Sequence, residues 1–330
     1  VSAHVAIWYA IIAILLGAKP LSEKVSRTAF FLYILFLQLA SAHHLLVEPG
    51  VSAEWRVFNT SYFMYMAVLG SMIHGMTVPG AIEAAQRRNG YTRGAFEWLR
   101  KAPWGNPAFS GMFLSLVMFG FLGGISGVVL GTEQINIMLH NTLYVPGHFH
   151  ATVVAGTTLA FMAVTYLLLP LIFQRQVIWP RLAKWQPYLF GIGVAGISLF
   201  MMGAGTLGVA RRHWDVAFSD ATLSFAYPAA AFLMLALNGL SAVMAAIGGA
   251  LFVVIVVASV LWGKPVDASN IVESLGPMPQ RQVGDAVSSY GNAGTWKLPG
   301  TYILVSVFFT AFVLYYFVNW KYLSQLWPMG

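Results

Sequence analysis

The chain has 330 residues, of which 58% are hydrophobic and only 9% are charged. A soluble domain usually carries about 25% charged residues, so the composition excludes an ordinary soluble protein and indicates an integral membrane protein. The net charge of +7 comes from basic residues between apolar stretches, and we expect no nucleic-acid partner. Cysteine is absent, which excludes disulfides, thiolate-bound zinc and iron–sulfur clusters. Any metal must therefore be bound by histidine, carboxylate or backbone groups.

Eight apolar stretches are candidates to cross about 30 Å of hydrocarbon. The first looks like the lower part of a helix whose beginning is missing, and it lacks the features of a signal peptide. A polar segment over 263–299, rich in Pro, Gly, Ser and Asn, is predicted to form a cytoplasmic loop. We predict an all-α, polytopic transmembrane helix bundle of about eight helices, over residues 1–17, 27–47, 58–82, 109–131, 147–173, 187–209, 227–262 and 300–322.

Lysine and arginine are concentrated in alternate connections between these stretches, namely the first, third, fifth and seventh. The positive-inside rule places those connections in the cytoplasm, so the C-terminus is expected outside.

Two histidine motifs occur on separate predicted helices, "SAHHLL" and "LYVPGHFHATVV". His43 lies 16 residues after Arg27 and therefore roughly 24 Å farther along its helix, in the outer part of the membrane. The motif "LYVPGHFHATVV" begins a helix that runs inward from the outer side. His148 and His150 are therefore expected at the same depth in the membrane as His43. Four histidines in one layer predict binding of copper or iron by neutral imidazole.

The spacing within each motif constrains the ligands. Successive helix positions turn by about 100°, so His148 and His150 point to nearly opposite sides and are expected to serve two different cofactors. The side chains of adjacent His43 and His44 also diverge by about 100°, so they could bind one ion only if the helix is locally distorted. A lone histidine in a membrane helix, such as His4 or His74, can instead simply bond a neighbouring serine or backbone carbonyl.

A third motif, "GVARRHWD", places Arg211 and Arg212 outside, against the positive-inside bias. A twin arginine above the histidine layer suits carboxylates such as haem propionates. The alternative is an interfacial arginine pair that anchors a helix end.

The motifs "AHHLL", "PWGNPAF", "HNTLYVPGHFH" and "VARRHW", in this order, resemble subunit I of the haem–copper oxygen reductases. The B family is the most similar, and the resemblance covers nearly all of the chain, as the C-terminal part of that subunit (family helices six to thirteen). It implies a prokaryotic cell-membrane enzyme that reduces dioxygen to water at a high-spin haem–copper centre. It also implies electrons from cytochrome c or a similar donor and coupling to proton translocation.

Residue by residue, the resemblance implies two haems and one copper ion. His43 and His44 match two ligands of the copper, His148 the axial ligand of the high-spin haem, and His150 one axial ligand of the low-spin haem.

Four further positions match polar groups that surround the haems. Arg211 and Arg212 match the propionate-binding arginines, and His140 and Asn141 match the polar cluster above the high-spin haem. The A family has an acidic, magnesium-binding residue where this chain has Asn141, which favours the B family.

Parts of the family's site are missing from the chain. The third copper ligand and the cross-linked tyrosine would lie before Val1; alternatively, His4 is that ligand, with Trp8 in place of the tyrosine. The second axial histidine of the low-spin haem is also absent. The expected partners are the N-terminal helices of subunit I in the same or a separate chain, other oxidase subunits including a copper-containing subunit II, and membrane lipid.

Ser71, His74 and Thr77 lie in the inner half of their predicted helix, and Ser71 and His74 share one face. They are candidates for a proton path, and hydrogen bonding between helices is the alternative. Two other functions stay open from the sequence: a nitric oxide reductase on the same scaffold, and a haem-free polytopic transporter.

Overall fold

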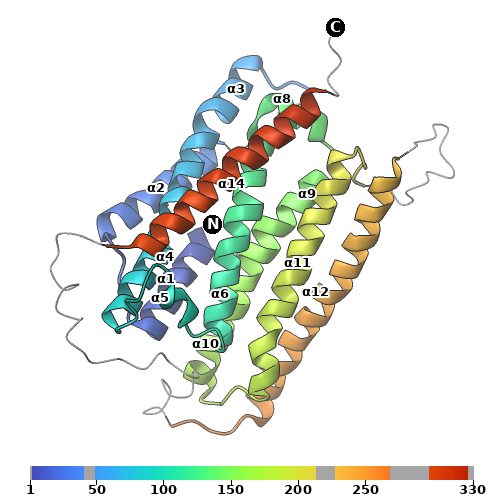
Figure 1. Cartoon of the computed structure of the whole chain (residues 1–330). Coiled ribbons are helices and arrows are strands. Elements are labelled where there is room, and N and C mark those ends of the chain that lie inside the picture. Colours follow the sequence, from blue (N-terminus) through green and yellow to red (C-terminus); the bar gives the residue numbers. More distant parts are fainter. Residues whose placement is uncertain (1, 41–48, 213–226, 268–296, 326–330) are drawn as a thin grey trace.

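The computed structural model of the chain describes residues 2–40, 49–212, 227–267 and 297–325 (Figure 1). Every regular element in these ranges is a helix, which confirms the predicted all-α fold. The long helices run side by side as a bundle, with short helices and loops at its two ends (Figure 1).

Labels α and η denote α-helices and π-helical segments. In chain order the elements are α1 (Ser2–Leu16), α2 (Glu23–Leu39), α3 (Ala53–Val57), η2 (Phe58–Phe63), α4 (Met64–Arg88), α5 (Glu97–Arg100), α6 (Pro107–Met118), η3 (Phe119–Gly124), α7 (Ile125–Gly131), α8 (Glu133–Leu139), α9 (Tyr144–Phe149), η4 (His150–Thr158), α10 (Leu159–Phe173), α11 (Pro180–Thr206), α12 (Ala229–Trp262) and α14 (Pro299–Ser324).

Within the described ranges, six continuous helical runs are long and apolar enough to cross a membrane. α1 is also apolar but has 15 residues, and α2 has 17 residues and ends just before residues 41–48, which are outside the described part. The six runs cover residues 53–88, 107–131, 144–173, 180–206, 229–262 and 299–322.

Helical runs can begin well before the apolar stretch that predicted them. The run expected from residue 58 begins at Ala53, where the Ser52 hydroxyl accepts a hydrogen bond from the Trp55 amide at 3.2 Å. The run expected from residue 187 begins at Pro180, a residue suited to the first position of a helix. Hydropathy locates the part of a helix that is apolar, whereas caps set where the helix begins.

The motif "PWGNPAF" has a local structural role at the start of α6. The Asn106 side chain accepts hydrogen bonds from the amides of Ala108 at 2.9 Å and Phe109 at 3.3 Å, and Pro107 occupies the first helical position. This combination starts the helix abruptly after a loop.

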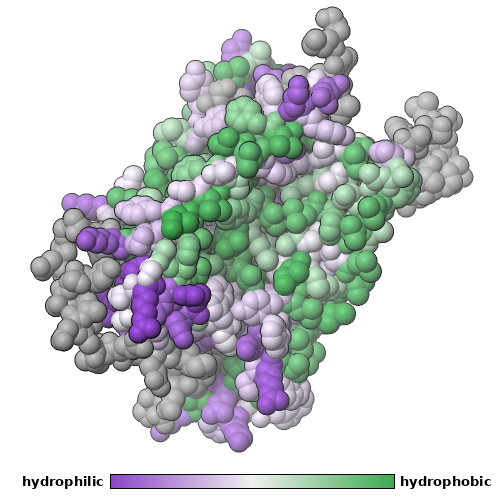
Figure 2. All heavy atoms as spheres, in the orientation of Figure 1, coloured by the Kyte–Doolittle hydropathy of each residue, from purple (hydrophilic) through white to green (hydrophobic). Residues whose placement is uncertain are grey.

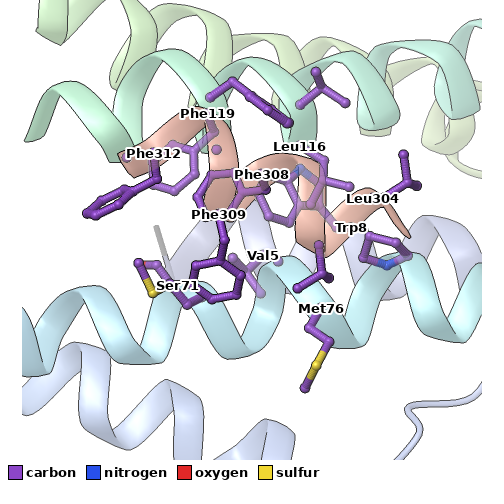
Figure 3. Close-up of a pocket in the computed structure, with 18 of the residues that line it drawn as sticks. Val5, Trp8, Ser71, Met76, Leu116, Phe119, Leu304, Phe308, Phe309 and Phe312 are labelled. Carbon is purple, nitrogen blue, oxygen red and sulfur yellow. The ribbon is translucent and has the colours of Figure 1, made fainter. Parts of the chain in front are cut away.

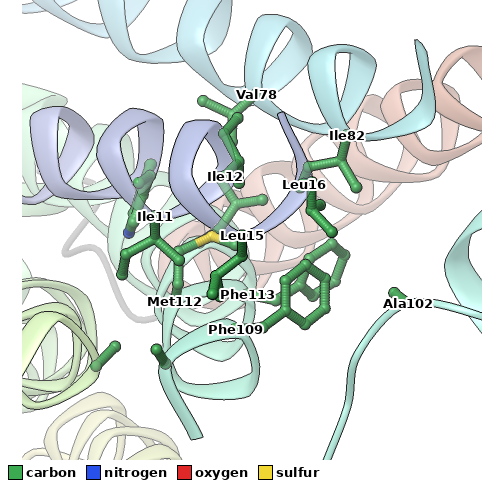
Figure 4. Packing of buried hydrophobic residues seen from close by; sticks show 14 of the residues in the cluster. Ile11, Ile12, Leu15, Leu16, Val78, Ile82, Ala102, Phe109, Met112 and Phe113 are labelled. Atoms are coloured by element: carbon green, nitrogen blue, oxygen red, sulfur yellow. The ribbon is translucent and has the colours of Figure 1, made fainter. Parts of the chain in front are cut away.

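The largest apolar core joins α1, α4 and α6 (Figure 4). Ile11, Ile12, Ile82, Phe109 and Met112 are each fully buried in it. α1 therefore buries one face against α4 and α6, while Ala6, Ala10 and Ala13 on its opposite face are exposed.

α11 and α12 approach each other closely along small residues. A Cβ atom added to Gly193 would lie 2.5 Å from the Ala245 nitrogen, and one added to Gly248 would lie 2.6 Å from the Phe190 nitrogen. Small residues allow this backbone approach between membrane helices. In Figure 2, apolar residues cover the flank of the bundle and hydrophilic residues gather toward its ends, as expected for a membrane-spanning protein. Most of the predicted loop 263–299 lies outside the described residues.

Candidate functional site

His148 lies on α9 and is almost fully buried, with 7% exposure. Its Nδ1 atom is 2.8 Å from the Ser126 hydroxyl oxygen on α7. The Ser126 hydroxyl donates to the carbonyls of Leu122 and Gly123, so its oxygen accepts the hydrogen bond from His148 Nδ1–H. That tautomer has its lone pair on Nε2. Gly127 allows the ring to lie here, because a Cβ atom at this position would be 3.1 Å from His148 Cε1.

His150 lies two residues later, where α9 continues into η4, and it is half-buried. Its Nδ1 atom is 2.7 Å from the Pro146 carbonyl oxygen. Because a carbonyl only accepts, Nδ1 must carry the proton, and the lone pair is again on Nε2. The His148 ring therefore bonds a neighbouring helix, whereas the His150 ring bonds its own.

Both imidazoles have the form of metal ligands. A metal-ligating histidine usually donates its other ring N–H to the protein, which fixes the tautomer and the ring orientation. The described residues contain no group of three or more His, Cys, Asp or Glu that could enclose an ion. Single imidazoles such as these fit haem iron, because a porphyrin supplies the equatorial ligands. His43 and His44 lie outside the described residues.

Asn141 and Arg211 are brought together in two loops at the end of the bundle. The Arg211 guanidinium donates to the Asn141 side-chain oxygen from Nε at 3.0 Å and Nη2 at 2.8 Å, and the Arg211 amide donates to the Asn141 carbonyl at 2.8 Å. His140 is the half-buried residue before Asn141, and Arg212 is the exposed residue after Arg211. All four predicted residues of this polar cluster therefore lie in two paired loops.

His74 and Thr77 on α4 belong to a hydrogen-bonded group that we call the Tyr9 cluster: Tyr9, Ser26, His74 and Thr77. The Tyr9 hydroxyl oxygen lies 2.7 Å from Thr77 Oγ1, 3.1 Å from Ser26 Oγ and 3.3 Å from His74 Nδ1. Tyr9 and Ser26 were not among the residues predicted from the sequence. An isolated hydroxyl in an apolar helix carries no signal until its neighbours are known.

Ser71, the third residue of the predicted proton path, borders an apolar cavity of about 180 Å³ instead (Figure 3). The cavity lies between α1, α4, η3 and α14. Its lining includes the aromatic side chains of Trp8 on α1, Phe119 on η3, and Phe308 and Phe312 on α14. A cavity of this size and lining suits a small apolar molecule.

His4 is fully buried on α1, and its Nδ1 lies 2.9 Å from Thr157 Oγ1 on η4. The ring packs against Trp8 and Phe119, at centroid distances of 4.7 and 4.5 Å. Thr157 is nine residues beyond His148 along a continuous, mostly π-helical run, so His4 contacts this run at a different level from His148. His4 Nε2 is buried and has no hydrogen-bond partner among the residues that the structure describes.

A buried ion pair lies within α4, near the end that is predicted to be cytoplasmic, and its carboxylate also bonds α14. The sequence did not indicate its burial. Arg87 Nη2 lies 2.7 Å from Glu83 Oε1, and both side chains are almost completely buried. Glu83 also accepts hydrogen bonds from the amides of Gly300 at 3.1 Å and Thr301 at 2.6 Å. The only indication in the sequence was the i, i+4 spacing of the two charges.

Residues 2–251 match the family model described as Cytochrome C and Quinol oxidase polypeptide I. Cytochrome c oxidase subunit 1 of Thermus thermophilus is 34% identical over 232 residues, which are 69% of this chain and 40% of that protein. Quinol oxidase subunit 1 of Bacillus subtilis (strain 168) is 29% identical over 144 residues, 42% of this chain and 22% of that protein. A solved heme-copper terminal oxidase dimer contains a similar chain, with a TM-score of 0.70 and 25% identity over 96% of this chain and 55% of that one. The match with this chain thus spans about two fifths of the Thermus relative.

Proposed function

The chain belongs to the cytochrome c and quinol oxidase polypeptide I family, and we propose that it forms part of the catalytic subunit of a B-family respiratory oxidase. The reaction is the reduction of dioxygen to water, with electrons from cytochrome c or a similar donor and coupling to proton translocation. The observation that carries this proposal is the pair His148 and His150, each with its Nδ1 atom within hydrogen-bonding distance of a protein oxygen.

The residues of this chain have distinct roles in the proposal. His148 holds the iron of the high-spin haem and His150 the iron of the low-spin haem, while His43 and His44 hold copper. When bound, the haems and copper supply oxygen binding and electron transfer. The protein orients the two imidazoles by different contacts: Ser126 bonds the first ring from α7, and the Pro146 carbonyl bonds the second within its own helix.

Two polar regions complete the proposed machinery. Arg211 and Arg212, with His140 and Asn141 beside them, bind haem propionates at the outer end. His74 and Thr77 deliver protons from the cytoplasmic side, and the hydroxyl of Tyr9 supports this role because it joins both of them to Ser26.

The proposed assembly is larger than this chain. It lies in a prokaryotic cell membrane, with the C-terminus of this chain outside, among membrane lipids. The partners are the N-terminal helices of subunit I, in the same or a separate polypeptide, and other oxidase subunits including one that contains copper. The third copper ligand, the cross-linked tyrosine and the second axial histidine of the low-spin haem belong to the N-terminal part.

Visible spectroscopy of the complete oxidase tests the proposal. His148→Ala should abolish the spectral change on carbon monoxide binding and stop turnover. His150→Ala should weaken the low-spin haem bands, or make that haem high-spin, while carbon monoxide still binds. Haem content is measured first, so that failed assembly is recognised.

Two outcomes contradict the proposal. Loss of carbon monoxide binding in His150→Ala with a normal low-spin spectrum would reverse the two assignments. Both haem signatures retained in both variants, or no haem absorbance in the wild-type protein, would refute haem ligation by this helix.

A further inference from the structure

The contact between Asn141 and Arg211 connects the arginine to the helix that carries His148. The same two loops are joined by the Leu143 amide, which donates to the Val209 carbonyl at 2.9 Å, and by a bridge between Thr142 and Ala210. α9 begins directly afterwards, at Tyr144. Consecutive residues of one loop thus set the position of Arg211 relative to the start of the His148 helix.

The backbone at Asn141 is in the left-handed region, with φ of 59°. Asparagine, aspartate and glycine adopt this conformation readily, whereas most other residues do so at a cost. The side-chain oxygen accepts from two nitrogens of one guanidinium, so it restricts the rotation of that group. Because the amide is neutral, this contact orients Arg211 without neutralising its charge.

We propose that Asn141 is a positioning residue for Arg211, which it holds in place for an anionic group bound above the high-spin haem. The inference rests on the proposed propionate role of Arg211. A carboxylate at this position would form an ion pair with the guanidinium and compete with the propionate for it. An uncharged acceptor in the same geometry orients the guanidinium without adding a negative charge beside it.

Two substitutions at Asn141 separate orientation from charge without straining the backbone. Asn141→Asp keeps the acceptor and adds a negative charge, so the midpoint potential of the high-spin haem should shift downward, because the oxidised iron is stabilised. Asn141→Gly keeps the left-handed conformation and removes the acceptor, so the potential should again fall. In neither variant should the visible band positions of the low-spin haem change. Redox titration followed by absorbance measures both shifts, independently of turnover.

Two controls identify the cause. Gln134→Glu adds the same charge at an exposed position of α8, near the same end of the bundle, and should shift the potential less than Asn141→Asp. Arg211→Gln should lower the potential by itself, and Asn141→Gly combined with Arg211→Gln should give no further shift, because the two residues act through one group.

The results distinguish this inference from the proposed function. If Arg211→Gln lowers the potential while both Asn141 variants match the wild type, the propionate role of Arg211 survives and the positioning role of Asn141 is refuted. If Arg211→Gln leaves the potential unchanged, the propionate role fails, and the positioning role fails with it. Additive shifts in the double variant would likewise overturn the inference.

Discussion

The Ser126 hydroxyl oxygen on α7 lies 2.8 Å from Nδ1 of His148 on α9, and both side chains are buried. The two residues are 22 positions apart, so the contact exists only when these helices pack. Its effect is chemical as well as structural, since a proton on Nδ1 that is donated to Ser126 leaves the Nε2 lone pair on the opposite side of the ring.

Replacing Ser126 with alanine should weaken the proposed iron ligation by His148. The imidazole loses the acceptor that fixes its tautomer, and losses of this kind typically reduce affinity or activity about 10- to 100-fold. The iron–histidine stretching band in resonance Raman spectra should move to lower frequency. Ser110→Ala is the matched control, because that hydroxyl donates to backbone carbonyls at the start of α6. An unchanged band in Ser126→Ala would contradict the assignment.

Replacing Gly147 with alanine should displace the histidine helix from α11. The added Cβ atom would lie 2.8 Å from the Met202 nitrogen and 2.9 Å from the Ser198 carbonyl oxygen, which are backbone atoms that cannot rotate away. Overpacking of this kind costs about 1–3 kcal/mol. We expect a lower denaturation temperature and lower haem retention. Gly239→Ala on α12, whose added Cβ would meet nothing within 4 Å, should leave both unchanged. Equal behaviour of the two variants would argue against this packing.

The apolar stretches and the motif around His148 and His150 were readable in the sequence because each is a local pattern. Run length predicts membrane helices, and two imidazoles two residues apart predict ligands on different sides of a helix. Ser126 was not predictable, because a serine in the apolar stretch 109–131 looks the same whether it bonds its own helix or a histidine on another. The pairing of Asn141 with Arg211 likewise depends on how two loops 70 residues apart meet.

Glu83 and Arg87 show that the burial of charged residues also cannot be predicted from a local sequence pattern. An i, i+4 pair near a helix end normally predicts a solvated surface. Here α14, from more than 200 residues later in the chain, covers the pair, and Glu83 bonds the first amides of that helix. Burial therefore came from an element whose position the local sequence does not encode.

Replacing Glu83 with alanine should strongly destabilise the protein. Arg87 would keep a buried charge without its carboxylate, and α14 would lose the acceptor at its first turn. Breaking a buried ion pair in this way costs about 3–5 kcal/mol. Thermal denaturation in detergent measures the loss. Glu83→Ala with Arg87→Met should recover part of it, because no unpaired charge is left buried.

The control for this prediction is the ion pair of Glu23 and Arg27 on α2. It has the same i, i+4 spacing, but its side chains are 69% and 72% exposed. Exposed pairs of this kind contribute about 0.3–0.5 kcal/mol, so Glu23→Ala should have little effect. A similar loss in the Glu23 and Glu83 variants would mean that burial of the second pair does not determine its contribution.

The final prediction concerns Tyr9, whose hydroxyl joins Ser26, His74 and Thr77. Thr77 donates its own proton to the Ile73 carbonyl, so Tyr9 donates to Thr77 and its oxygen accepts from Ser26 or His74. Tyr9→Phe removes this junction, and we expect proton uptake and turnover to fall roughly 10-fold or more, by analogy with the loss of a proton-transfer group. Haem spectra should stay unchanged, and the solvent deuterium isotope effect on turnover should increase. Tyr188→Phe, which loses the hydrogen bonds of its hydroxyl with the Trp104 carbonyl and the Ser110 side chain, is the control. If Tyr9→Phe turns over at the wild-type rate with an unchanged isotope effect, the Tyr9 cluster only holds α1, α2 and α4 together.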